Sequence, residues 1–247
     1  MKNKIYSNID FANKMFEDQE MINNNLANLS TKGFKSKFNY FVKIYDKKNK
    51  NIDNKTINYY DNSLGQFNST NKPLDLAICD KDGWFETKTK KLNTYLTRNG
   101  NIKINKDHYL VINNNFLLNT HNKPIYIPKN FLPKIKSDGT IIINYKKNKN
   151  YKKNIIGKIK LQKININKLD EIYNGMFKIK NKHYKKNYNE KNNIKIKTGV
   201  LEESNVNPIS NIINIIYKSR IFETIMKTIS VQNENEKRIN QILNINN

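Results

Sequence analysis

Cysteine, histidine and arginine are scarce in this 247-residue sequence, which contains one, three and three of them. The lone Cys79 cannot form an intramolecular disulfide. With no histidine near it in sequence, we expect it to be a half-buried strand residue rather than a catalytic thiol. The histidines are too far apart to match a metal-binding motif, and we expect no metal site; they are His108, His121 and His183.

Long apolar runs are also absent. No stretch of about 18 apolar residues occurs, so the sequence predicts no transmembrane helix. Lys2 and Lys4 are not followed by an apolar segment, and we therefore expect no cleavable secretory signal. Apolar residues make up 37% of the chain, which is low for a compact globule. The length still allows one large domain or two small ones.

The charge is strongly positive, with 45 basic and 21 acidic residues and a formal net charge of +24. Such a balance is typical of proteins that bind nucleic acid or anionic membranes. Nearly all of it is lysine, and lysine, asparagine and isoleucine form about half of the chain, which indicates AT-rich codon usage. Phosphate recognition favours the planar arginine fork instead. A basic nucleic-acid-binding protein remains the alternative, because bases could stack on tyrosines among the lysines: Tyr145, Tyr151, Tyr184 and Tyr188.

Signs of catalysis are missing. The sequence shows no nucleophile–base pair, no glycine-rich phosphate loop and no paired carboxylates in an apolar setting. Residues 80–83 (DKDG) resemble the start of a calcium loop but lack its closing ligands, so we expect a type I′ hairpin turn there. Glu202 and Glu203 are open to two interpretations, a solvated junction or a contact between subunits. We expect no enzyme and no cofactor.

The N-terminal region is predicted to be a helix within residues 1–33. Its apolar residues recur at helical spacing close to that of a coiled coil. Gly33 can adopt the left-handed conformation that ends many helices, and Phe34 could then fold back onto Leu29. The apolar stripe consists of Ile5, Ile9, Ala12, Phe16, Leu26 and Leu29.

The C-terminal region, residues 208–247, is predicted to be a second helix after a junction at residues 197–207. Asn207 suits the N-cap and Pro208 the first helical position. A helix from about 208 to 243 would be roughly 50 Å long. Its apolar positions include Ile212, Ile216, Phe222, Ile225 and Ile229.

The middle of the chain has short β-like runs separated by turn signals. Examples are LDLAI, WFETK, NIKIN and YLVI, within residues 74–112. This pattern favours an antiparallel β domain over residues 73–196. The polar residues 34–72 are predicted to be an extended junction, and the fold class is α+β.

Four blocks of sequence resemble, in the same order, those of the flagellar rod and hook family of axial proteins. They are NNLANLSTKGFK (residues 24–35), PLDLAI…DGWF (73–85), YLTRNGNIKI (95–104) and GVLEESNVNP (199–208). Within the family, Trp84 and the RIFETIMKTI segment (220–229) favour a subunit of the proximal rod. A distal rod or hook protein is the alternative.

The resemblance implies a structural subunit that assembles into a hollow axial rod crossing the periplasm. The two terminal helices are expected to pair as a coiled coil facing the tube interior, with their apolar stripes as the polymerisation interface. The expected partners are other rod proteins, copies of itself and the flagellar type III export apparatus. No cofactor, specific nucleic acid or membrane insertion is implied.

Overall fold

The computed structural model describes residues 2–46, 51–91, 93–147, 150–173, 175–180 and 194–245. The chain forms two compact units. The first consists of residues 1–27, 37–58 and 207–247, and the second of residues 28–36 and 59–206. Both units are therefore discontinuous in sequence, and each is described on its own.

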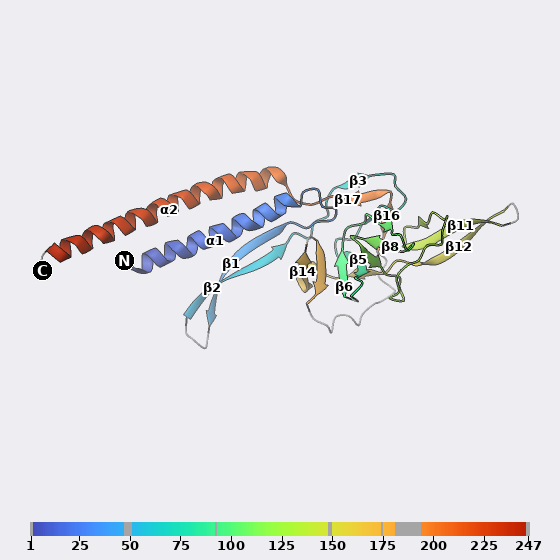
Figure 1. The fold of residues 1–247 in the computed structure, drawn as a ribbon, viewed down its shortest axis with the longest axis horizontal. Coiled ribbons are helices and arrows are strands. Elements are labelled where there is room, and N and C mark those ends of the chain that lie inside the picture. The colour runs from blue at the N-terminus through green and yellow to red at the C-terminus, as the bar shows by residue number, and fades with distance from the viewer. Residues whose placement is uncertain are drawn as a thin grey trace. The chain divides into compact units, whose positions relative to one another are not determined.

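The first unit is built from two long helices and a two-stranded sheet. Helix α1 (Lys2–Ala27) and helix α2 (Pro208–Ile245) lie side by side and run antiparallel (Figure 1). Strands β1 (Lys37–Asp46) and β2 (Asn51–Tyr60) pair with each other, and β1 contacts α1. The Asn25 side chain joins helix to strand, because it accepts from the Lys37 N–H at 2.9 Å and donates to the Lys37 carbonyl at 3.0 Å.

The helices do not form the predicted coiled coil. Polar side chains connect them: Asn8 donates to Gln232 at 3.3 Å, Gln19 donates to Ser219 at 3.5 Å, and Lys218 forms an ion pair with Asp18. The stripe residues Ile9, Phe16, Ile212 and Ile216 are instead 41%, 56%, 49% and 50% exposed. The prediction rested on apolar spacing alone, whereas Asn8, Asp18 and Gln19, which lie outside the predicted stripe, make the hydrogen bonds and the ion pair that join α1 to α2.

Two boundaries also differ from the prediction. Helix α1 ends at Ala27 rather than near Gly33, because Asn28 begins a turn. The Thr31 N–H donates to the Asn28 carbonyl at 3.1 Å, and the Thr31 hydroxyl donates to the Asn28 Oδ1 at 3.0 Å. Strands β1 and β2 lie where an extended junction was expected.

The second unit is β-rich, and each strand pairing recorded among its described residues is antiparallel. Because helices α1 and α2 lie at the two ends of the sequence and the strands lie between them, the fold class is α+β. The strands are β3 (Phe67–Ser69), β4 (Leu76–Ile78), β5 (Gly83–Lys88), β6 (Thr94–Thr97), β7 (Lys103–Ile104), β8 (Leu110–Ile112), β9 (Asn115–Leu117), β10 (Lys134–Ile135), β11 (Thr140–Lys147), β12 (Asn150–Lys158), β13 (Leu161–Lys163), β14 (Leu169–Tyr173), β15 (Met176–Ile179), β16 (Ile196–Thr198) and β17 (Val200–Glu202).

The largest sheet has the order β14-β15-β6-β5-β9-β8-β7, and β13 also pairs with β5. A second sheet has the order β10-β11-β12, and a short 3₁₀ helix (Ile166–Lys168) precedes β14. Two small sheets, β16 with β4 and β17 with β3, pair strands from near the start and near the end of residues 59–206. An apolar core that includes Phe85 and Leu110 fills one side, and a smaller one around Trp84 and Phe177 fills the other.

The predicted hairpin at residues 80–83 is wrong. Strand β4 pairs with β16, and not with β5. Neither Asp82 nor Gly83 has the positive φ that a type I′ turn requires. The Gly83 N–H donates to the Asp80 carbonyl at 3.1 Å, so a turn is present. It leads away from β4 because a strand from near residue 200 takes the pairing position.

Candidate functional site

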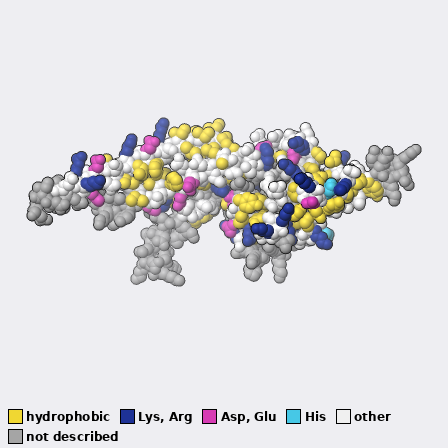
Figure 2. All heavy atoms as spheres, in the orientation of Figure 1, with side chains coloured by type: hydrophobic (Ala, Val, Ile, Leu, Met, Phe, Trp, Pro, Cys, Tyr) yellow, Lys and Arg dark blue, Asp and Glu magenta, His cyan; other side chains and the backbone are white. Residues whose placement is uncertain are grey.

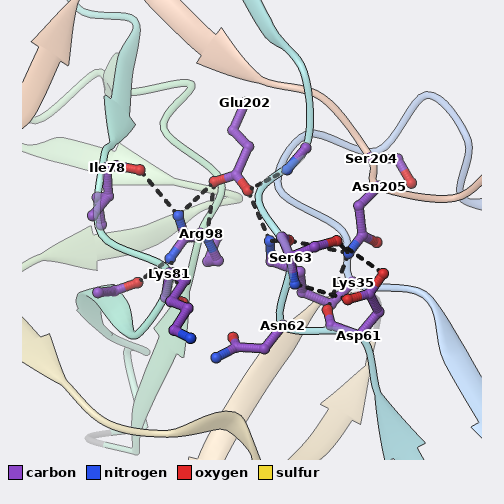
Figure 3. Close-up of polar contacts among 12 residues, drawn as sticks. Lys35, Asp61, Asn62, Ser63, Ile78, Lys81, Arg98, Glu202, Ser204 and Asn205 are labelled. Carbon is purple, nitrogen blue, oxygen red and sulfur yellow. Dashed lines mark hydrogen bonds and ion pairs between the residues drawn. The ribbon is translucent and has the colours of Figure 1, made fainter.

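A buried cluster of three charged side chains lies in the second unit. The carboxylate of Glu202, at the end of β17, sits between the side chains of Lys35 and Arg98 (Figure 3). The side chains of Lys35 and Arg98 are 0% exposed and that of Glu202 is 1% exposed. Buried charges are costly unless they are paired and hydrogen-bonded. The geometry of these three groups therefore governs the local structure.

Arg98 is the most highly connected member of the cluster. Its Nε and Nη2 both lie 2.8 Å from Oε2 of Glu202. Nη2 also donates to the carbonyl of Ile78 at 3.0 Å. Nη1 donates to three carbonyls where the chain turns into β5, those of Asp80 at 2.9 Å, Lys81 at 3.1 Å and Gly83 at 2.6 Å. The guanidinium thus fixes a turn and a strand as well as the carboxylate.

Lys35 takes the other oxygen of the carboxylate. Its Nζ lies 2.8 Å from Oε1 of Glu202 and also donates to the Ser63 carbonyl. The Gly65 N–H donates to the same Oε1 at 3.0 Å. Burial lowers the pKa of the Lys35 ammonium below its ordinary value, although the negative charge of Glu202 opposes this shift.

Residues 28–36, here called the strap, follow α1 in the chain and bond mainly to residues 202–206, here called the closing segment. The Gly33 N–H donates to the Glu202 carbonyl at 2.8 Å. The Ser36 N–H donates to the Asn205 Oδ1 at 2.7 Å, and the Asn205 N–H donates to the Phe34 carbonyl at 3.3 Å. Lys32 and Glu203 form a half-exposed ion pair at 2.5 Å.

Gly33 is needed at its position for two reasons. Its φ is +68°, a conformation that residues with a side chain rarely adopt. A Cβ there would also lie 2.6 Å from the Arg98 carbonyl carbon and 2.7 Å from the Arg98 carbonyl oxygen. The strap therefore approaches Arg98 so closely that only glycine fits without a shift of the backbone.

The four sequence blocks that carried the family resemblance meet at this cluster. The first supplies Lys35, the second supplies the carbonyls of Ile78 and Gly83, the third supplies Arg98 and the fourth supplies Glu202. Glu202 fits neither the solvated junction nor the contact between subunits that was considered for it, because it is buried and its carboxylate is paired within one chain. The available signal was a glutamate in a block that is shared with a family, together with one of the few arginines.

Comparison with known proteins is decisive for the family. A family model described as "Flagellar basal body rod FlgEFG protein C-terminal" matches residues 197–242. A "Flagellar basal-body rod protein FlgF" of Buchnera aphidicola subsp. Schizaphis graminum is 38% identical over 252 residues, covering 100% of both chains. The chain belongs to the FlgF family of flagellar basal-body rod proteins. The FlgF of Salmonella typhimurium is 29% identical and covers 99% of this chain and 100% of its own.

The FlgEFG match begins at the end of the β-rich unit and continues into α2, so it contains the closing segment. The predicted junction residues lie next to the closing segment, either in sequence (Asn207 and Pro208) or through backbone hydrogen bonds (Gly33 and Phe34). Asn207 accepts from the Ser210 N–H at 3.1 Å, and α2 begins at Pro208. Phe34 is 1% exposed and lies near Gly175. Neither Gly33 nor Phe34 lies at the end of α1.

The residues predicted as the polymerisation interface of this FlgF-family chain divide by exposure. Ala12 is buried on α1. The side chain of Ile5 lies outside the described residues. Exposed members are Ile9, Phe16, Ile212 and Ile216, and half-buried ones are Leu26, Leu29, Phe222, Ile225 and Ile229.

The other candidate sites find no support in the described part of the chain. No group of three or more His, Cys, Asp or Glu side chains there could hold a metal ion. Cys79 is half-buried just after β4. No helix among the described residues is long and apolar enough to span a membrane. Of the four tyrosines considered for base stacking, only Tyr145 has a described side chain, and it is half-buried.

Proposed function

We propose that this FlgF-family protein is a structural subunit of the wall of the proximal rod, which assembles with other rod proteins and with copies of itself. One observation carries the proposal. The first half of α2 has an exposed apolar face, here called the α2 face, and Figure 2 shows its apolar side chains gathered together. It consists of Ile209, Ile212, Ile213, Ile216 and Tyr217.

The α2 face is too apolar for a helix that remains in water. Its five residues are between 49% and 70% exposed and follow the i, i+3, i+4, i+7 spacing of one helix face. Burial of one such aliphatic side chain stabilises a contact by roughly 1.5–3 kcal/mol. Contiguous apolar patches on soluble proteins mark interaction sites. Repeated in each subunit, this face would provide a large driving force for assembly.

A second apolar region on the same unit supports an open polymer. Residues on β1 are between 37% and 57% exposed, and they are Phe38, Tyr40, Phe41 and Val42. An open helical assembly needs two different patches on each subunit, so that one copy binds the next without closing a ring. The α2 face and the β1 residues are chemically suited to these two roles.

The position of the rod implies how the subunit reaches it. We infer that the chain passes uncleaved through the flagellar type III export apparatus and becomes part of a rod that spans the periplasm. Mass spectrometry of the subunit from isolated basal bodies tests this inference. An N-terminus at or next to Met1 is expected, and a mature chain that begins well after Met1 would contradict it.

The α2 face is tested by the variants Ile212→Asp and Ile216→Asp. We expect the thermal midpoint of the purified monomer to stay within a few degrees of wild type, because these side chains are exposed. Assembly into basal bodies should be lost, because each variant places a carboxylate in an apolar contact. Asn214→Asp is the control, since it adds the same charge at an exposed position on α2 outside this face. Normal rods from Ile212→Asp and Ile216→Asp would contradict the proposal.

A further inference from the structure

The members of the buried cluster differ in how far each depends on the other two. Arg98 depends least on the others. Four carbonyl groups, all from residues 78–83, accept hydrogen bonds from its Nη1 and Nη2. Its guanidinium also lies 5.8 Å from the centre of the Trp84 ring. Arg98 therefore has more hydrogen-bond acceptors outside the cluster than either of the other two members.

Glu202 comes second in this order. Its Oε2 is paired with Arg98, and its Oε1 accepts from the Gly65 N–H at 3.0 Å. Both partners lie outside the strap. The backbone of residues 200–202 is held independently by the pairing of β17 with β3, and the Glu203 N–H donates to the Gln66 carbonyl at 2.8 Å. Glu202 and the backbone N–H of Glu203 thus have partners that do not depend on the strap.

Lys35 comes last. The Lys35 side chain is 0% exposed. Without Glu202 its remaining hydrogen-bond acceptor would be the Ser63 carbonyl, and the charge of Asp61, which acts on it more weakly than Glu202, would be left to attract it. Burial of an ammonium without a counter-charge is strongly unfavourable. The strap backbone shows the same dependence, because the N–H groups of Gly33 and Ser36 donate to Glu202 and Asn205. Burial of Phe34 also favours docking of the strap, but Phe34 cannot be buried unless the neighbouring Lys35 is buried too.

We propose that the strap is a latch that closes only after the closing segment is in place. Lys35 and Glu202 are 167 residues apart in the chain. The strap therefore stays undocked until residues 202–206 have been made and have folded, even if the rest of the β-rich unit has already formed. The strap becomes ordered last. This inference concerns folding order and does not rest on the proposed polymer.

Pulse-labelling hydrogen exchange during refolding of the full chain tests the order directly. The amides of Gly33 and Ser36 should gain protection no earlier than the amide of Glu203. Because the Glu203 N–H donates to Gln66 rather than to the strap, it reports on the closing segment alone. Protection of Gly33 or Ser36 before Glu203 would overturn the proposal.

Native-state exchange of variants tests the dependence in both directions. Lys35→Met should make the Gly33 and Ser36 amides exchange at least about tenfold faster, while the Glu203 amide keeps its protection because Glu202 remains on Arg98. Glu202→Gln should accelerate exchange at the strap amides and at the Glu203 amide. The proposed order would be overturned if Lys35→Met accelerated exchange equally at the strap amides and at the Glu203 amide. It would also be overturned if Lys35→Met left the exchange of the strap amides unchanged.

Two matched controls separate the buried pair from the exposed one. Lys32→Met and Glu203→Gln make the same chemical changes in the half-exposed ion pair of the same two segments. Each should change exchange at Gly33 less than about threefold, because exposed pairs contribute little. If Glu202→Gln fails to fold, Lys35→Met alone decides, since it leaves the pair of Glu202 and Arg98 intact.

Discussion

At the scale of single residues, the Glu202 carboxylate has the most specific role. It accepts from an arginine, a lysine and a backbone N–H that come from three separate parts of the chain. A buried ion pair is weak evidence for stability, because apolar replacements of similar volume are often tolerated. Its value lies in specificity. An apolar side chain at position 202 could not distinguish a correctly docked strap from one that is shifted by a residue.

The close approach at Gly33 gives a quantitative prediction. Gly33→Ala should lower the free energy of unfolding by more than Gly175→Ala. Both positions have positive φ, +68° and +75°, and this conformation alone costs a residue with a side chain about 1–2 kcal/mol. At Gly33 the added Cβ would also meet the Arg98 backbone, whereas at Gly175 the nearest atom is 4.0 Å away. Urea titration of both variants gives the comparison, and equal losses would contradict the packing described here.

The lowered pKa of Lys35 predicts a dependence of stability on pH. In the unfolded chain Lys35 holds its proton up to its ordinary pKa of 10.5, whereas the folded chain releases it at a lower pH. Between the two values the unfolded state binds more protons, so the contribution of Lys35 to the free energy of unfolding rises with pH. The difference in stability between wild type and Lys35→Met should therefore move in favour of wild type as pH rises toward 10.5. Urea titrations at several pH values measure it, and a difference that falls with pH would refute the burial argument.

At the scale of elements, polar side chains link α1 to α2. Asp18 is 5% exposed, and it pairs with Lys218 in the middle of the contact. A double-mutant cycle of Asp18→Ala and Lys218→Ala should give a coupling of about 0.5–3 kcal/mol. The exposed pair of Asp10 and Lys14 on α1 is the control, with an expected coupling of about 0.2–0.5 kcal/mol. Coupling no larger than the control would show that the helices are not paired in the free subunit.

Local signals made some elements predictable. The start of α2 at Pro208 can be read from the sequence, because Asn207 caps the helix and proline suits its first turn. The end of α1 could not be read in this way. Gly33 is a strong helix-stop signal, but Asn28 and Thr31 form a turn earlier in the chain, and Gly33 serves the approach to Arg98 instead.

Long-range pairing limited the rest of the prediction. The turn at residues 80–83 was expected to be a hairpin because its sequence suits one, yet β4 pairs with β16. The buried cluster joins residues 104 and 167 positions apart, a relationship that no local pattern encodes. The coiled coil was predicted from apolar periodicity alone. Periodicity shows which side chains share a face, but it does not show whether that face meets a helix of the same chain or another molecule.

At the scale of the whole molecule, the apolar surface of the subunit suits assembly better than isolation. The β-rich unit has its own cores and a buried cluster that fixes the two segments leading to the helices in sequence. The helical unit leaves apolar side chains of α2 and β1 in water. The net charge of +24 favours solubility of the free subunit. At short range, apolar contacts between subunits must outweigh this repulsion.

The most direct test of the central claim is cryo-electron microscopy of isolated basal bodies that contain this chain. We expect density for the chain in the wall of the proximal rod, with Ile212 and Ile216 of the α2 face buried against a neighbouring subunit. Lys35, Glu202 and Arg98 should remain together within one chain. A rod in which this chain is absent, or in which the α2 face contacts no other subunit, would contradict the account.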